Sequence, residues 1–318
     1  MIGEIAPNLY NPAMNRILII KLGALGDFIQ AFPCFQAIRT AFLKAEISLL
    51  TTAPFASLGQ AAPWFDNVMI DARPRWTDLR GLAHLRTQLR GFDLVIDLQT
   101  SGRSTRYHAL AGSPRWSGLV RDDPFFHANP WRDEMHTLAR QADQLRYAGI
   151  PACDSADISW LTSTPLQARA ASPYIIIVPG AARHRPEKRW PIEKYAALAC
   201  ALKQQGLQIL IIGTATEKPL AREILRHCPA ARDMTGETRL TELATLMKGA
   251  RHVVGNDTGP MHLAAMAGTP ATVLFSSDSN PALTAPVGRR FGQVTVLRAA
   301  DISAIPVETI LASCGKTL

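Results

Sequence analysis

Cysteine is scarce in this sequence and follows no pattern. Five cysteines are scattered among 318 residues, and no two of them form a C-x-x-C pair. An odd number of distant cysteines disfavours a disulfide framework and a cysteine-rich zinc site, and it is typical of a protein kept in a reducing compartment. The cysteine content therefore predicts a cytoplasmic protein that is stabilised by its apolar cores.

Other signals are missing as well. No apolar stretch approaches the roughly 20 residues that a membrane-spanning helix needs, and the N-terminus lacks the basic start and apolar run of a signal peptide. The eight histidines form no H-E-x-x-H pair, and neither a G-x-S-x-G elbow nor a Walker loop occurs. These absences disfavour membrane-spanning proteins, zinc and serine hydrolases and P-loop NTPases. We expect neither a metal ion nor another cofactor.

The charge of the chain is distributed unevenly. Lysine and arginine number 34 against 26 aspartates and glutamates, which gives a net charge of +8. Residues 161–318 hold 18 basic and 11 acidic side chains, whereas residues 1–160 hold 16 and 15. Such an excess points to an anionic partner, which is a nucleic acid, a phosphorylated small molecule or an acidic membrane surface. No helix-turn-helix pattern or aromatic-plus-basic stacking run accompanies it, so we do not expect nucleic-acid binding.

Apolar strands alternate with amphipathic helices through both halves of the chain, as in a parallel sheet that helices cover on both faces. Strands are predicted at Arg16–Lys21, Ile47–Leu50, Val68–Ile70, Leu94–Asp97, Tyr174–Val178, Leu207–Ile212, His252–Val254 and Ala271–Phe275. Helices are predicted at Asp27–Phe42, Asp78–Leu89, Pro191–Gln205, Glu217–His227, Leu240–Lys248 and Pro260–Ala267.

We therefore predict an α/β protein with two Rossmann-like, doubly wound parallel-sheet domains that face a central cleft. The length of the chain and its 47% hydrophobic content are sufficient for two cores. The domains are placed at residues 1–160 and 173–318. Residues 161–172, rich in Ser, Thr, Ala and Pro, are the predicted linker. The final helix could pack back on the N-terminal domain.

Two glycine-containing loops join a strand to a helix, the position at which open α/β sheets bind ligands. The first is KLGALGD at Lys21–Asp27, which is not the dinucleotide fingerprint because its glycine spacing is wrong. Asp27 could cap the helix, or it could accept a proton from a hydroxyl bound in the cleft. The second is GNDTGPMH at Gly255–His262, where a helix N-terminus could bind a diphosphate. Alternatively, Asp257 is a helix cap and His262 a packed helix residue.

Charged residues follow other predicted strands of the second half. The loop after Tyr174–Val178 contains PGAA and then the basic residues Arg183, His184, Arg185, Lys188 and Arg189. This loop could bind phosphate oxygens or could be a solvated basic segment. Glu217, after the next strand, could accept hydrogen bonds from ribose hydroxyls or could occupy the first turn of a helix.

Four arginines of the first half lie near strand ends. They are Arg73, Arg75, Arg103 and Arg106. They could bind an anionic acceptor, or they could belong to a solvated surface, since exposed arginines are common.

Three of these segments resemble the ADP-heptose:lipopolysaccharide heptosyltransferases of glycosyltransferase family 9. They are RILIIKLGALGDFIQAFPCFQAIR, PGA with EKRWP downstream, and GNDTGPMHLAAMAGTP. The resemblance runs from about Arg16 to the C-terminus in the order and spacing of the family. It implies a GT-B fold, with an acceptor-binding N-terminal domain and a nucleotide-sugar-binding C-terminal domain.

The resemblance also implies an activity and its residues. The expected reaction is an inverting, metal-independent transfer of a heptose from ADP-heptose to the inner core of lipopolysaccharide. Asp27 would be the general base, and Lys188 would neutralise the donor diphosphate during catalysis. The donor-binding residues would be Gly180, Lys188, Glu217, Asp257, Thr258, Gly259 and His262. Arg103 lies where the family often has a basic residue for the anionic acceptor, here lipid A–Kdo. Arg73, Arg75 and Arg106, which the strand ends suggest, could bind this acceptor with it, and the protein could contact the inner face of the inner membrane peripherally.

The sequence departs from the family in two places. Ala181 and Ala182 stand where some members have hydroxyl side chains, so phosphate contacts there would fall to backbone N–H groups and Lys188. About 13 residues precede Met14, which is either the true start or the end of a loose arm. Three alternatives stay open: transfer of another nucleotide sugar, another GT-B enzyme such as an epimerase, and a non-catalytic nucleotide-sugar or nucleic-acid binding module.

Overall fold

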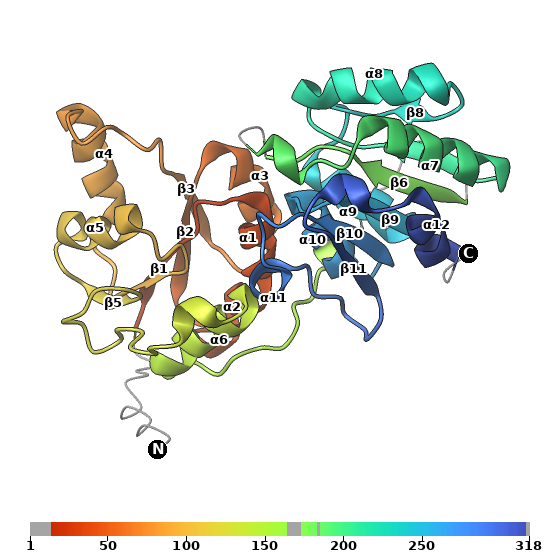
Figure 1. The fold of residues 1–318 in the computed structure, drawn as a ribbon. Coiled ribbons are helices and arrows are strands. Elements are labelled where there is room, and N and C mark those ends of the chain that lie inside the picture. Colours follow the sequence, from red (N-terminus) through yellow and green to blue (C-terminus); the bar gives the residue numbers. More distant parts are fainter. Residues whose placement is uncertain (1–13, 164–172, 183–184, 316–318) are drawn as a thin grey trace. The chain divides into compact units, whose positions relative to one another are not determined.

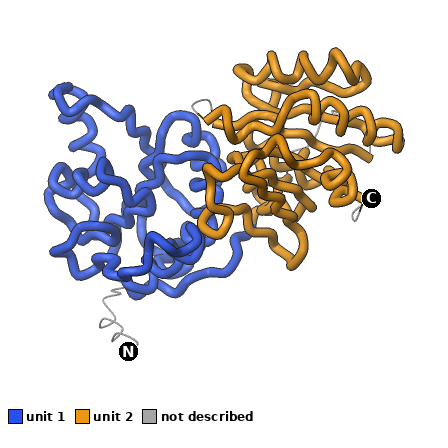
Figure 2. The backbone as a smooth tube through the Cα atoms, in the orientation of Figure 1, with its two compact units in different colours: residues 1–157 blue, residues 158–318 orange. Residues whose placement is uncertain are grey.

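The computed structural model describes residues 14–163, 173–182 and 185–315 of the chain. The chain divides into two compact units, residues 1–157 and 158–318 (Figure 2). Most of the predicted linker, along with Arg183 and His184 of the basic loop and the segment before Met14, lies outside the described residues.

The first unit is built on a five-stranded parallel sheet with the strand order β3-β2-β1-β4-β5 (Figure 1). Its strands are β1 (Arg16–Ile20), β2 (Glu46–Thr51), β3 (Asn67–Ile70), β4 (Leu94–Asp97) and β5 (Arg115–Ser117). Its helices are α1 (Leu25–Gln30), α2 (Phe32–Ala41), α3 (Ala53–Ala61), α4 (Leu79–Leu89), α5 (Gly102–Ala111) and α6 (Thr137–Tyr147). The central strand β1 is fully buried from Ile17 to Ile20, as expected for a strand that is covered on both faces.

The predicted helix over Asp27–Phe42 is two helices in the structure. Pro33 is the second residue of α2. A proline at this point inside one continuous helix would lack the N–H needed for its hydrogen bond and would clash with the carbonyl four residues earlier. The chain therefore ends α1 at Gln30 and begins α2 at Phe32. The short α1 keeps the KLGALGD loop and Asp27 at the end of β1.

The second unit contains a six-stranded parallel sheet with the order β11-β10-β9-β6-β7-β8 (Figure 1). Its strands are β6 (Tyr174–Val178), β7 (Gln208–Ile211), β8 (Arg232–Asp233), β9 (His252–Asn256), β10 (Ala271–Phe275) and β11 (Val294–Arg298). Its helices are α7 (Ile192–Gln204), α8 (Lys218–His227), α9 (Leu240–Gly249), α10 (Gly259–Met266), α11 (Pro281–Thr284) and α12 (Val307–Gly315). The prediction of an α/β protein with two parallel sheets is thus confirmed.

The final helix packs within the second unit. Helix α12 packs against α7 and β10 of the second unit. Ile310 and Cys314 are fully buried there, in the same apolar cluster as Tyr195 and Leu198 of α7. The apolar face of α12 therefore completes the core of its own unit.

Each sheet has one point at which the direction of strand succession reverses. In the first sheet it lies between β1 and β4, where Ile20 pairs with Asp97. In the second it lies between β6 and β9, where Val178 pairs with Gly255. The loops that leave adjacent strands diverge at such a point and form a crevice outside the carboxyl ends, which is the usual ligand site of open α/β sheets.

Candidate functional site

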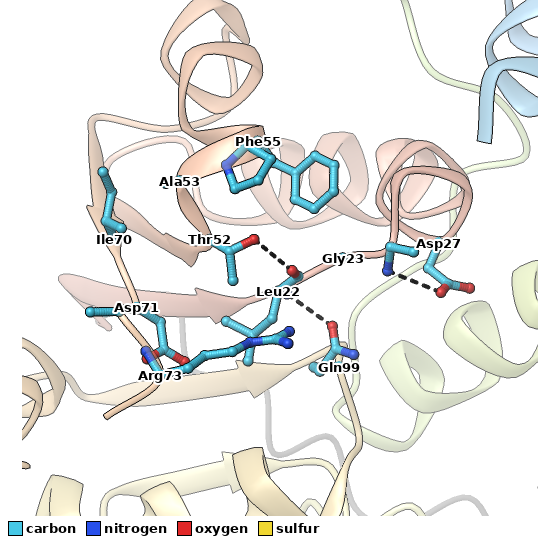
Figure 3. Close-up of a pocket in the computed structure, with 13 residues that line it drawn as sticks. Leu22, Gly23, Asp27, Thr52, Ala53, Phe55, Ile70, Asp71, Arg73 and Gln99 are labelled. Atoms are coloured by element: carbon cyan, nitrogen blue, oxygen red, sulfur yellow. Dashed lines mark hydrogen bonds between the residues drawn. The ribbon is translucent and has the colours of Figure 1, made fainter. Parts of the chain in front are cut away.

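The first unit has a pocket at the carboxyl edge of its sheet. We call it the Asp27 pocket; its volume is about 760 Å³ (Figure 3). Its lining comes from the loops after β1, β2, β3 and β4 and includes Leu22, Gly23, Asp27, Thr52, Phe55, Arg73 and Gln99. Four loops that are distant in the sequence therefore contribute to one cavity.

The turn from β1 into α1 depends on Gly23. This residue has a φ of +117°, and a Cβ atom placed on it would lie 2.4 Å from the ring of Phe55. Glycine is the residue that satisfies both conditions. Asp27 is the third residue of α1, and its Oδ2 accepts a hydrogen bond of 3.3 Å from the N–H of Ala24. Asp27 thus combines a first-turn role in the helix with a position on the pocket wall.

A buried lysine and a buried aspartate lie next to this turn. Lys21 is 3% exposed, and its Nζ donates a hydrogen bond of 2.9 Å to the carbonyl of Leu98. Burial lowers the pKa of Lys21, against the opposing effect of the nearby Asp27 and Asp97 carboxylates. Burial raises the pKa of Asp97 to about 6, although hydrogen bonds to its carboxylate and the charge of Lys21 act in the other direction. Buried groups with shifted pKa values are common beside functional sites.

Gln99 is a pocket residue that the sequence did not reveal. Its side chain extends from the loop after β4, and its Oε1 accepts a hydrogen bond of 2.9 Å from the N–H of Leu22 (Figure 3). This bond joins the loops on the two sides of the switch point. A single glutamine after a strand carries no motif, and the only signal available was its position two residues beyond Asp97.

The four arginines predicted to bind an acceptor have different environments. Arg73 lines the Asp27 pocket, and its side chain extends across the pocket toward Leu22 (Figure 3). Arg103 is held by the protein itself, since it donates to the hydroxyl of Tyr107 at 2.6 Å and to the carbonyl of Pro74 at 2.7 Å. Arg75 is exposed, as is Arg106. Only Arg73 of these four lines the Asp27 pocket.

The second unit places its predicted site residues around Asn256, the last residue of β9. Asn256 is fully buried. Its Oδ1 accepts hydrogen bonds of 3.0 Å from the N–H of Trp190 and from the hydroxyl of Tyr195. Its Nδ2 donates to the carbonyls of Pro179 and Gly180 at 2.8 and 3.2 Å. One side chain therefore fastens the loop after β6 and the start of α7 to the end of β9.

Lys188 and Asp257 form an ion pair beside this asparagine. The distance from Nζ to Oδ2 is 2.7 Å, and both side chains are 11% exposed. Asp257 is not the helix cap that one interpretation of the sequence suggested, because the residue before α10 is Thr258. The pair places a lysine ammonium next to the start of α10.

The start of α10 offers donors to an anion. The N–H of its first residue, Gly259, has no partner within the helix, as for every α-helix N-terminus, and the side chain of Thr258 makes no capping hydrogen bond to the helix. His262 is one turn further along α10 and is 8% exposed. A helix N-terminus with a lysine beside it is the arrangement that binds phosphate groups.

Glu217 and Gly180 are in close contact. The Oε2 of Glu217 accepts a hydrogen bond of 2.6 Å from the N–H of Thr214, and its carboxylate lies over Gly180, where an added Cβ would be 1.7 Å from Oε1. Only glycine at position 180 leaves room for the carboxylate. Glu217 therefore stabilises the turn before α8 and presents a carboxylate beside the loop after β6.

Solved structures identify the class to which this fold belongs. A glycosyltransferase family 9 structure from Veillonella parvula covers 99% of this chain and of its own, with a TM-score of 0.80 and 20% sequence identity. The structure of the E. coli heptosyltransferase WaaC with ADP covers 95% of this chain and 100% of its own, with a TM-score of 0.75 and 20% identity. The chain therefore has the GT-B fold, which consists of two Rossmann-like domains.

The chain belongs to glycosyltransferase family 9. The model of glycosyltransferase family 9 (heptosyltransferase) matches residues 82–303, which confirms the resemblance inferred from the motifs. Lipopolysaccharide heptosyltransferase 2 of Salmonella typhimurium is 34% identical over 37% of this chain, and the alignment spans only 35% of that relative. Lipopolysaccharide core heptosyltransferase OpsX of Haemophilus influenzae is 25% identical over 91% of this chain and 86% of its own.

We expect Asn256→Asp to destabilise the second unit by roughly 2–3 kcal/mol, because the buried carbonyls of Pro179 and Gly180 lose their donors and face a carboxylate oxygen instead. The measurement is the free energy of unfolding in urea. The matched control is Asn280→Asp, since Asn280 is an exposed helix cap and aspartate caps equally well. Equal stabilities of the two variants would contradict this prediction.

Proposed function

We propose that this protein transfers a heptose from ADP-heptose to an anionic lipid-linked saccharide of the lipopolysaccharide inner core. The observation that carries the proposal is the ion pair of Lys188 and Asp257 at the start of α10, because it joins a cation to a helix N-terminus at the switch point of the second sheet. A solved relative with this fold is described as bound to ADP, and several relatives are named lipopolysaccharide or lipooligosaccharide heptosyltransferases. These names support a nucleotide-sugar donor and a lipopolysaccharide acceptor.

In the proposed donor site, the diphosphate binds to Lys188, Thr258 and the N–H of Gly259. The carboxylate of Glu217 accepts hydrogen bonds from the ribose hydroxyls, and Gly180 allows the nucleotide to approach the backbone. Asp257 and His262 face the sugar and its phosphate. All these residues lie between the ends of β6, β7 and β9 and the first turn of the helix that follows each strand, and their polar groups match those of an ADP-sugar.

The proposed reaction is a single displacement with inversion. An acceptor hydroxyl attacks the anomeric carbon of the heptose while the bond from that carbon to the phosphate oxygen breaks. Asp27 takes the proton of the hydroxyl, and ADP leaves with the bonding electron pair. Negative charge grows on the diphosphate as the bond breaks, so the Lys188 ammonium and the α10 N-terminus bind the transition state more tightly than the ground state. No step in this scheme requires a metal ion.

Asp27→Asn tests the base. We expect wild-type protein to transfer heptose from ADP-heptose, in preference to UDP- and GDP-sugars, to a lipid A–Kdo acceptor. The variant should bind ADP normally but turn over about 10²–10⁴-fold more slowly, because asparagine cannot take the proton. Its amide oxygen can still accept the Ala24 N–H bond, so the turn is retained.

The same assay contains its own controls. Asp122→Asn, a change of an exposed aspartate in the same unit, should leave turnover unchanged. Near-wild-type turnover by a folded Asp27→Asn protein would remove Asp27 as the base. Tight binding of UDP but not of ADP would defeat the ADP-heptose proposal and favour a transferase of another sugar or an epimerase.

Lys188→Met tests the donor site. We expect the Kd for ADP to rise by about 10- to 100-fold, which corresponds to the loss of one charge-assisted hydrogen bond. Isothermal titration with ADP is the measurement. Lys203→Met, which removes an exposed lysine from the last turn of α7, is the matched control and should leave the Kd unchanged. If both variants bind ADP as wild type does, Lys188 does not contact the diphosphate.

We further propose that the protein works in the cytoplasm, in peripheral contact with the inner face of the inner membrane. No helix in the described part of the chain is long and apolar enough to cross a bilayer. The first unit carries two exposed apolar side chains near the start of α4, Trp76 and Leu79, which are 39% and 78% exposed. The guanidinium carbons of Arg103 and Arg106 lie 5.2 and 5.6 Å from the Trp76 ring centroid. Exposed apolar side chains with arginines close to one of them suit an anionic bilayer surface.

Leu79→Ser tests this contact in a vesicle sedimentation assay. We expect wild-type protein to bind vesicles of phosphatidylglycerol and phosphatidylethanolamine but not those of phosphatidylcholine. The variant should bind the anionic vesicles about tenfold more weakly, since it loses roughly 1.5 kcal/mol of apolar burial. Leu43→Ser is the matched control, because Leu43 is similarly exposed, at 76%, but lies two residues beyond the end of α2. Equal binding by wild type and both variants would exclude this surface.

A further inference from the structure

Gln99 has a backbone position that is fixed by the fold. It follows β4 by two residues, and the N–H groups of Gln99 and Thr100 each donate a hydrogen bond of 3.0 Å to Oδ1 of Asp97. Asp97 is itself fully buried at the end of the strand. The loop therefore cannot shift without breaking contacts to a buried carboxylate, and Gln99 is held at the edge of the Asp27 pocket.

The orientation of the Gln99 amide follows from its partner. The N–H of Leu22 can only donate, so the side-chain atom 2.9 Å from it must be the carbonyl oxygen Oε1. The amide nitrogen Nε2 then lies on the side away from Leu22, as Figure 3 shows. Within the described part of the chain, no side-chain or backbone acceptor takes a hydrogen bond from this nitrogen. Two N–H donors are thus presented at the pocket wall by a side chain that cannot turn without losing its bond to Leu22.

The neighbours of Gln99 in the pocket make this donor distinctive. Asp27 is an acceptor when ionised, and Arg73 is a cationic donor that lines the same cavity. Thr52 donates its hydroxyl to the carbonyl of Leu22 at 2.9 Å. The Gln99 amide differs from these three side chains because it is a neutral donor whose direction is fixed by its hydrogen bond to Leu22.

We propose that Nε2 of Gln99 binds an oxygen of the acceptor saccharide in the Asp27 pocket and so holds the reacting hydroxyl toward Asp27. The inference rests on the proposed transferase function and adds a specificity-determining residue to it. A carboxylate or hydroxyl oxygen of the acceptor fits this donor, and an acidic sugar is also attracted by Arg73.

Gln99→Glu separates this role from a purely structural one. Glutamate keeps an oxygen for the N–H of Leu22 but replaces the NH₂ group with a negatively charged oxygen. We expect the KM for the lipid A–Kdo acceptor to rise by about 10- to 100-fold, the size of one hydrogen bond to a charged group. The Kd for ADP and the unfolding transition should stay at wild-type values. Gln99→Met loses the hydrogen bond from Leu22 and the proposed one to the acceptor. It should therefore raise KM similarly and also lower the free energy of unfolding.

Gln60→Glu is the matched control for charge, because Gln60 is exposed on α3 of the same unit. It should leave the acceptor KM unchanged. A wild-type KM in Gln99→Glu, combined with reduced stability in Gln99→Met, would overturn the proposal. Gln99 would then have only a structural role, as the hydrogen-bond acceptor of the Leu22 N–H. Failure of the proposed function is a different result: wild-type protein would then neither transfer heptose nor bind a deacylated Kdo-containing saccharide in calorimetry, and the inference about Gln99 would fall with it.

Discussion

The parallel pairing of the strands in the described part of the chain is the constraint on which both candidate sites depend. Parallel strands bring all their carboxyl ends to one edge, while strands buried on both faces admit few polar side chains. Polar residues that must meet are therefore concentrated just beyond the strand ends. Asp27, Arg73 and Gln99 follow β1, β3 and β4, and Lys188 and Asp257 follow β6 and β9. The strand order of each sheet then decides which loops become neighbours. In the first sheet the loop after β1 lies beside the loop after β4, and in the second sheet the loop after β6 lies beside the loop after β9.

Loops that diverge at a switch point need a connection, and each unit uses a side-chain amide for it. An amide is suited to this because it carries an acceptor and donors on one rigid plane. Both the oxygen and the nitrogen of the Asn256 amide form hydrogen bonds within the protein. Four such bonds join the loop after β6 and the start of α7 to β9. Gln99 uses its oxygen on Leu22 and leaves its nitrogen at the pocket. The two amides thus differ in how much hydrogen-bonding capacity they leave for a ligand.

Sequence patterns located the strands best where burial is complete. Leu94–Asp97, Tyr174–Val178 and Ala271–Phe275 were predicted with the observed bounds, because a short apolar run between turns has few other structures open to it. Strands β5, β8 and β11 were not predicted; all three lie at a sheet edge, and β11 is only partly buried. The local motifs also indicated Asp27 and the residues around Asp257. They could not show that Arg103 donates hydrogen bonds to Tyr107 and Pro74, or that Gln99 accepts one from Leu22. These partners lie 4, 29 and 77 positions away in the sequence.

The ion pair of Lys188 and Asp257 raises the question of how a lysine that is already neutralised could bind the diphosphate of the proposed donor. An ammonium group has three donors, and Asp257 takes one of them at 2.7 Å. The remaining two are available to phosphate oxygens, and the carboxylate fixes the direction in which they point. A long lysine side chain otherwise loses considerable rotamer freedom on binding. In the proposed donor site, most of that ordering has occurred on folding, so the cation would be in place before negative charge develops on the leaving group. The partial loss of net charge would be offset by the positive end of α10, whose first turn contains no acidic residue.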